Sequence, residues 1–178
     1  MDYDCVLGDN FYCSYMLTTK VLEMGHRDLR FVGNFDATSS IKDRFMGFAR
    51  ALMEHNIQVS KEDILNDRDE NGTLIDVNLP EKLPSVFVCN CDATAVNLMA
   101  QLTQKGIKGP QDVSITGFDN YYGQKIPSVP LTTVQINPED VAALASELII
   151  KKIKGAPYIK GRHLAGGKII LRESLSSI

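Results

Sequence analysis

Residues 85–120 read SVFVCNCDATAVNLMAQLTQKGIKGPQDVSITGFDN, and this stretch decides the fold. The apolar run 85–89 predicts a buried strand, and residues 93–105 have the apolar spacing of a helix that ends at Gly106. Residues 113–118 are a second β-branched run. A strand, a helix and a second strand in this order form a right-handed crossover between parallel strands. The stretch therefore predicts an α/β fold.

The same alternation continues on both sides of this stretch. Further strands are predicted at 3–8, 29–32, near Ile64, at 131–136 and at 168–172, and further helices at 12–24, from Ser39 or Ser40 to about Leu52, and from Asn137 to about Lys154. Ser39 or Ser40 is a suitable cap for the second of these helices. Asn137 followed by Pro138 is a typical start of a helix. We expect a mostly parallel sheet flanked by helices in three layers, αβα.

Composition limits the classes of function. The 178 residues are 44% hydrophobic and 23% charged, as in ordinary globular proteins, and the net charge is −3. A domain that binds nucleic acid by itself usually carries a basic face, which this charge does not favour. No apolar run approaches the ~20 residues of a membrane span, and MDYDCVLGDN at the start lacks the features of a signal peptide. We expect a cytoplasmic protein without a membrane partner.

The four cysteines, Cys5, Cys13, Cys89 and Cys91, do not predict a disulfide framework in a cytoplasmic chain of this length. Cys89 and Cys91 form a Cys-x-Cys, but no second pair or neighbouring histidine completes four metal ligands. The expectation is two small packed side chains on one face of a strand, with no metal and no cofactor.

Polar residues follow several predicted strands, and ligands of parallel sheets bind beyond the carboxyl ends of the strands. The candidates lie directly after predicted strands or up to about one helical turn further on: Asp9, Thr38, Ser40, Arg44, Asn90, Cys91, Asp92 and Asp119. Carboxylates, amides and a guanidinium suit a polyol, because each hydroxyl both donates and accepts hydrogen bonds. Four nearby aromatic residues are candidates to pack on a sugar ring, namely Phe11, Tyr12, Tyr121 and Tyr122.

Plainer roles remain open for these residues. Asp92, Ser40 and Asp119 also suit the caps of helices or turns. Arg44 is also placed to pair with Asp43 or Glu54 on the surface. The sequence has no nucleophile elbow, no Walker loop and no Gly-x-Gly-x-x-Gly after a strand, so no catalytic residues are predicted.

Several motifs together resemble the lactose-repressor and galactose-repressor family of bacterial transcription regulators. They are Asp9-Asn10, residues 22–33 (LEMGHRDLRFVG), 43–48 (DRFMGF), 106–120 (GIKGPQDVSITGFDN) and 130–134 (PLTTV). They span nearly the whole chain in the order that the family has. Each motif alone is weak, and the combination is specific.

The resemblance implies a fold like that of periplasmic sugar-binding proteins of type I, in which two lobes close on an effector. Residues 1–178 then form an effector-binding domain, mainly its C-terminal lobe, and residues 131–156 cross back to the first lobe. The family's helix-turn-helix, hinge helix and first lobe lie outside the match. Contact with operator DNA therefore belongs to an N-terminal headpiece, and a homodimer is expected.

The resemblance also assigns roles to individual residues. Asp9 is similar to the effector-contacting aspartate at the lobe crossover, Arg44 to the effector-binding arginine, and Asp119 to the aspartate of a Gly-aromatic-Asp turn. Thr38 and Ser40 fall where effector-contacting polar residues lie.

The chain departs from the family in two places. The family's Asn-Asp pair after the strand 85–89 is interrupted as Asn90-Cys91-Asp92, so that Cys91 takes the asparagine position, and the aromatic residue that is common near 66–72 is absent.

The function predicted in this way is the effector-sensing and dimerisation region of a repressor that binds a small sugar-like ligand. A transport-associated sugar-binding protein and, less favoured, a sugar-modifying α/β enzyme are the alternatives. With three histidines and no dense lysine and arginine patch, the sequence does not favour a phosphorylated effector.

Overall fold

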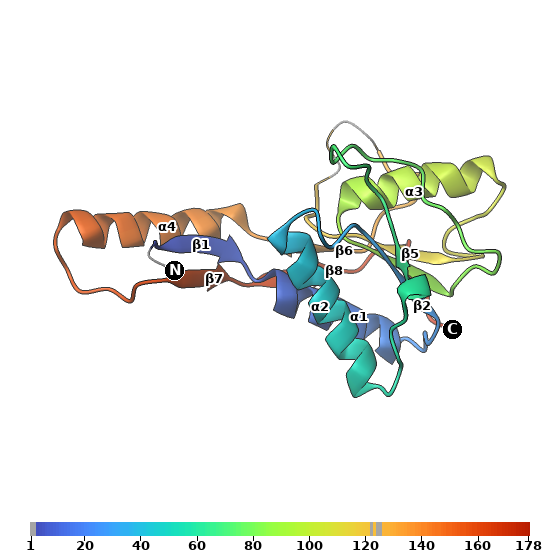
Figure 1. The fold of residues 1–178 in the computed structure, drawn as a ribbon, viewed down its shortest axis with the longest axis horizontal. Helices are drawn as coiled ribbons and strands as arrows, with labels where there is room; N and C mark the ends of the chain where they lie inside the picture. Colours follow the sequence, from blue (N-terminus) through green and yellow to red (C-terminus); the bar gives the residue numbers. More distant parts are fainter. Residues whose placement is uncertain (1–2, 122, 124–125) are drawn as a thin grey trace.

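A computed structural model describes residues 3–121, 123 and 126–178. Figure 1 shows a body of sheet and helices from which a narrower arm projects. The sheet of the body has four parallel strands in the order β3 (Ile64–Leu65), β2 (Leu29–Val32), β4 (Val86–Cys89) and β5 (Ser114–Thr116). The predicted α/β fold with a mostly parallel sheet is confirmed.

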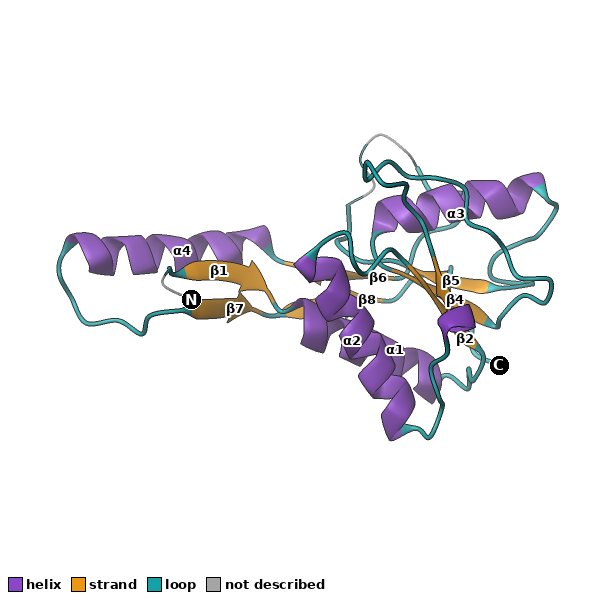
Figure 2. Ribbon diagram, in the orientation of Figure 1, coloured by secondary structure: helices purple, strands orange, loops and turns teal. Residues whose placement is uncertain are grey.

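Helices cover both faces of this sheet (Figure 2), with α1 (Asn10–Glu23) and α2 (Ser39–Glu54) on one side and α3 (Asp92–Gln104) on the other. The pleat of β4 distributes its side chains between the two cores. Val86 and Val88 pack with α1 and α2, whereas Phe87 and Cys89 pack with α3. All four are buried, as expected for a central parallel strand. The three layers are therefore α, β and α.

The two helices on the first face approach each other closely at Gly47. A Cβ atom at this position would lie 2.2 Å from the carbonyl oxygen of Phe11. The cap of α2 differs from the prediction, because Thr38 rather than Ser39 or Ser40 precedes the helix. Thr38 has extended backbone angles, and its Oγ1 accepts a hydrogen bond of 3.1 Å from the amide of Ile41.

The arm of Figure 1 consists of β1 (Cys5–Gly8) paired in parallel with β7 (Arg162–Ala165), and of α4 (Pro138–Ile153) lying along them. No residue of α4 is buried. The sequence analysis missed β7, because RHLA lacks β-branched residues and a clear alternation of apolar and polar positions.

Antiparallel strands β6 (Thr133–Ile136) and β8 (Gly167–Ile170) join the arm to the body. Beneath them Cys13, Leu17, Phe118 and Val134 form a small buried cluster. A parallel bridge between Thr116 and Thr132 continues the sheet of the body next to β5.

The segment between α2 and β4 is mostly irregular. It contains a short 3-10 helix, η1 (Lys61–Asp63), directly before β3. Among the described residues, no helix has the length and apolar character needed to cross a bilayer.

Candidate functional site

The carboxyl ends of β1, β4 and β5 meet around the guanidinium of Arg44, where the arm joins the body. Arg44 Nε donates to Asn10 Oδ1 at 2.8 Å, Nη1 to the carbonyl oxygen of Asn90 at 2.7 Å, and Nη2 to Asp119 Oδ1 at 2.8 Å. The guanidinium carbon also lies 3.9 Å from the ring centroid of Phe118. Only 12% of the side chain is exposed. Arg44 thus connects three strand ends that are far apart in the sequence.

The surface pairing considered for Arg44 is not what the structure shows. Asp43 pairs instead with Arg162 at 2.8 Å. Glu54 pairs with Arg50 at 2.9 Å and accepts a hydrogen bond of 2.7 Å from Tyr15. Successive residues of a helix point about 100° apart, so Asp43 and Arg44 face different neighbours.

The carboxylate of Asp119 is set by an unusual turn. Asp119 and Asn120 have positive φ angles of 106° and 52°, which bend the chain sharply after β5. Desolvation raises the pKa of Asp119 although 41% of its side chain is exposed, and the charge and hydrogen bonds of Arg44 oppose that rise. The predicted proximity of Arg44 and Asp119 is present in the structure.

Asp92 is fully buried and binds the segments that follow β5. Its Oδ1 accepts from Thr133 Oγ1 at 2.6 Å, and its Oδ2 accepts from the amide of Tyr121 at 2.7 Å. Burial raises the pKa of Asp92 to about 6, against the effect of these two hydrogen bonds. A Cβ at Gly117 would lie 2.2 Å from Asp92 Oδ1, so glycine is needed there. Asp92 therefore positions the turn that carries Asp119.

Asn90 also turns its side chain into the body. Its Nδ2 donates to the carbonyl oxygen of Val32 at 3.0 Å, to Asp67 Oδ2 at 2.7 Å and to Thr94 Oγ1 at 3.1 Å. Its Oδ1 is buried without a hydrogen-bond partner among the described residues. What Asn90 offers to the rim is its carbonyl oxygen, which Arg44 binds.

Cys91 lies next to Asn90 with 9% of its surface exposed, and its Sγ is 3.3 Å from Thr94 Oγ1. All four cysteines are free thiols, and burial raises the pKa of Cys89 well above its usual value. Within the described residues there is no group of three or more side chains placed to hold a metal ion.

The remaining predicted site residues occupy the edge of the same region. Asp9 follows β1 and caps α1, because its Oδ1 accepts a hydrogen bond of 3.0 Å from the amide of Tyr12. Thr38 caps α2. Ser40 lies half-buried in the first turn of α2. Of the aromatic candidates, Phe11 is half-buried, Tyr12 and Tyr121 are exposed, and Tyr122 lies outside the described residues.

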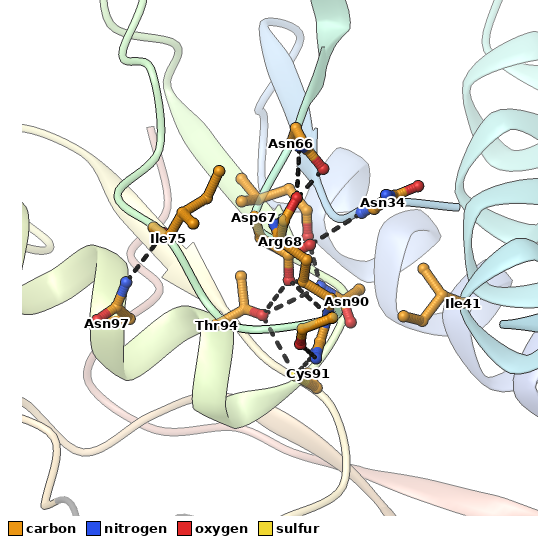
Figure 3. A network of polar contacts seen from close by, with 12 residues as sticks. Asn34, Ile41, Asn66, Asp67, Arg68, Ile75, Asn90, Cys91, Thr94 and Asn97 are labelled. Atoms are coloured by element: carbon orange, nitrogen blue, oxygen red, sulfur yellow. Dashed lines mark hydrogen bonds and ion pairs between the residues drawn. The ribbon is translucent and has the colours of Figure 1, made fainter. Parts of the chain in front are cut away.

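Sequence reasoning missed Asp67 and Arg68, which lie beside the end of β4 (Figure 3). Asp67 is 1% exposed, and its Oδ1 accepts from the amide of Asn34 at 2.9 Å. Its Oδ2 accepts from Asn90 at 2.7 Å and from Thr94 Oγ1 at 2.5 Å. Both residues follow β3 closely, so applying the strand-end rule to the weak strand near Ile64 would have found them.

Comparison with known proteins places the chain in a family. The model of the periplasmic binding protein-like domain matches residues 18–175. A curated relative, the HTH-type transcriptional repressor PurR of Glaesserella parasuis serovar 5, is 31% identical over 144 residues, which are 79% of this chain and 42% of the relative. The chain spans about half the length of the curated relatives it matches.

Solved structures share the fold. A LacI-type transcription regulator from Bifidobacterium animalis subsp. lactis superposes with a TM-score of 0.79 at 22% identity, covering 99% of this chain and 68% of the other. A LacI family regulator from Enterococcus faecium with bound ribose has a TM-score of 0.78 at 19% identity, covering 98% and 66%. The chain belongs to the periplasmic binding protein-like domain family, in the form found in regulators of the LacI/GalR family.

Proposed function

We propose that this chain is the C-terminal part of the effector-sensing domain of a transcriptional repressor, and that it binds a small sugar-like effector at the rim around Arg44. One observation carries the proposal. The Arg44 guanidinium connects Asn10 at the crossover from β1, the carbonyl oxygen of Asn90 after β4, and the carboxylate of Asp119 after β5. A ligand that binds there acts on all three strand ends at once.

The chemistry of the rim favours a polyhydroxylated ligand. Asp9 and Asp119 supply acceptors, Arg44 supplies donors, and a sugar hydroxyl uses both. Tyr121 belongs to the same turn as Asp119, is 74% exposed, and offers an aromatic face to the apolar side of a sugar ring. The related regulator from Enterococcus faecium with bound ribose supports this choice of ligand.

The arm supports the proposal that a first lobe packs against this chain. It exposes large apolar side chains on both α4 and the loop that follows it, with Ile150 50%, Ile153 80% and Ile159 82% exposed. Residues 131–156, which run from β6 into α4, then cross into that lobe. A ligand held between the lobes changes their arrangement, and through it the operator affinity of an N-terminal headpiece in a cytoplasmic homodimer.

Calorimetric titration tests the proposal. D-ribose, D-glucose and cellobiose are titrated into the purified chain and into the full-length repressor that contains it, and the sugar is recovered afterwards. We expect saturable binding, unchanged sugar and an altered affinity for operator DNA. Conversion of the sugar would favour the enzyme alternative, and binding without any effect on DNA affinity would favour a transport protein.

Arg44→Lys and Arg50→Gln make a matched pair for this experiment. Lysine at 44 keeps the charge but cannot hold three acceptors in the geometry of a guanidinium, so binding is expected to weaken at least tenfold. Arg50 lies on the same helix with 54% of its side chain exposed, and its substitution is expected to leave binding unchanged. Equal affinities for both variants would contradict the placement of the site.

A further inference from the structure

Arg68 is a mostly buried cation that uses only part of its hydrogen-bonding capacity within the described residues. Only 21% of its side chain is exposed. Its Nη1 lies 3.4 Å from the carbonyl oxygen of Gly72, its Nη2 lies 3.5 Å from Cys91 Sγ, and its buried Nε makes no hydrogen bond within the described chain. Normal N–H···O bonds measure about 2.7–3.2 Å. A guanidinium has five N–H donors, and leaving them unpaired away from water is unfavourable.

Asp67 balances the charge of Arg68 without satisfying these donors. Its Oδ2 lies 3.4 Å from Arg68 Nε. That oxygen already accepts shorter bonds from Asn90 and Thr94, and Oδ1 accepts from the amide of Asn34. In the network of Figure 3 both carboxylate oxygens of Asp67 are engaged by other donors, and within the described residues Arg68 keeps a long 3.4 Å bond to Gly72 and a contact with the Cys91 thiol.

The beginning of α3 lies beside Arg68. Cys91 is the N-cap residue of this 13-residue helix and makes no side-chain cap hydrogen bond. The amides of Ala93 and Thr94, in the first turn, have no carbonyl partner within the helix, and Ala93 is exposed. The helix dipole adds partial positive charge at this end. The acidic Asp92 of the same turn points away, to Thr133 and Tyr121.

The two arginines of the region meet adjacent residues. Arg44 binds the carbonyl oxygen of Asn90, and Arg68 contacts the thiol of Cys91. Asn90 and Cys91 are adjacent in the chain, so a ligand seated at Arg44 lies near the guanidinium of Arg68 as well. Arginine binds carboxylate and phosphate oxygens with two parallel hydrogen bonds, which matches the donors that Arg68 leaves unused.

We propose that Arg68 and the first turn of α3 form an oxyanion subsite of the effector site, so that the effector carries a carboxylate or phosphate group. This inference rests on the proposed function. It changes the sequence-based expectation about phosphorylated effectors, because a dense basic patch is not required. One arginine with unused donors beside an uncapped helix start supplies the recognition.

The test follows the arginine side chain directly by nuclear magnetic resonance of the ¹⁵N-labelled chain. Sodium phosphate and, separately, sodium acetate are titrated at constant ionic strength. We expect saturable shifts of the Arg68 Nε–Hε signal and of the Ala93 amide, and the anion with the stronger effect identifies the preferred group. Arg68→Gln should weaken anion binding at least tenfold, equivalent to about 1.4 kcal/mol. Arg50→Gln, an exposed arginine on α2, should leave it unchanged.

The absence of saturable shifts, or equal anion affinity in the wild-type chain and Arg68→Gln, would overturn the subsite. If Arg68→Gln does not fold, Arg68→Lys keeps the charge without the planar fork and is expected to show intermediate affinity. Unchanged affinity in the lysine variant would equally reject the role of the guanidinium.

Paired ligands separate this proposal from the function on which it rests. D-ribose is compared with D-ribose 5-phosphate, and D-glucose with D-gluconate. Binding of neutral and anionic members with equal affinity would refute the subsite and leave the sugar-sensing function standing. Anion binding at Arg68 without any Arg44-dependent sugar binding would refute the sensing function instead.

Discussion

Replacing Asp92 by asparagine is expected to remove a component of stability that depends on pH. Burial raises the pKa of Asp92 from an ordinary value of 3.8 to about 6 in the folded chain. Between these two values the folded state holds a proton that the unfolded state has lost. The free energy of unfolding therefore falls as the pH rises through this interval. A difference of about two pKa units corresponds to about 3 kcal/mol.

Urea unfolding of the wild-type chain and Asp92→Asn at about pH 4 and about pH 7 measures this component, because the titration of other groups contributes equally to both proteins. Asparagine keeps the shape and an acceptor for Thr133 or Tyr121 but does not titrate. Losing one carboxylate oxygen also changes the free energy of unfolding of the variant, by an amount that is the same at both pH values. The difference in free energy of unfolding between Asp92→Asn and wild type is expected to shift in favour of the variant by up to about 3 kcal/mol between the lower and the higher pH.

The exposed Asp76 supplies the control, since Asp76→Asn is expected to have the same free energy of unfolding as wild type at both pH values. Parallel curves for wild type and Asp92→Asn would refute the assigned pKa. If the free energy of unfolding of the wild type instead rose relative to that of the variant with increasing pH, the folded state would stabilise the charged carboxylate, which contradicts a raised pKa.

Three further predictions concern packing, capping and the arm. Gly47→Ala is expected to cost about 1–3 kcal/mol in urea unfolding, because the new Cβ meets the carbonyl oxygen of Phe11; an unchanged midpoint would refute the close approach of α1 and α2. Thr38→Ala should lose about 1 kcal/mol with the cap on Ile41, and Thr38→Ser should recover most of it. Ile153→Lys should change the stability of the chain by less than about 0.5 kcal/mol, as 80% of Ile153 is exposed, and a larger loss by thermal unfolding would mean that the arm is covered.

Local patterns in the sequence were sufficient to predict most elements of the body. The strand 29–32 was predicted with the bounds observed, because three of its four residues, Leu29, Phe31 and Val32, are apolar and buried in the covered sheet. The arm was harder to predict. β7 is only four residues long and gains its partner from β1, far away in the sequence, so the pairing leaves no local pattern in RHLA.

The strand-end rule predicted which candidate residues come together but did not give the direction of each side chain. Arg44 and Asp119 meet as expected. Asn90 and Asp92 lie at the predicted place, yet their side chains turn inward to Asp67 and to Thr133. Direction depends on tertiary partners that come from other strands, and these cannot be inferred from one strand end alone.

The contrast between the two arginines shows why counting charges in a sequence is a weak guide to ligand chemistry. Arg44 and Arg68 each lie near an aspartate, and both are mostly buried. Arg44 already makes three hydrogen bonds of 2.7–2.8 Å, so a ligand that needs more than its remaining donors displaces a strong bond. Among the described residues Arg68 has contacts of 3.4–3.5 Å, because Asn34, Asn90 and Thr94 already occupy the carboxylate oxygens of its neighbour. A ligand oxygen at Arg68 therefore forms new bonds without displacing strong ones, and this difference in what is displaced makes Arg68 the more selective of the two for an oxyanion.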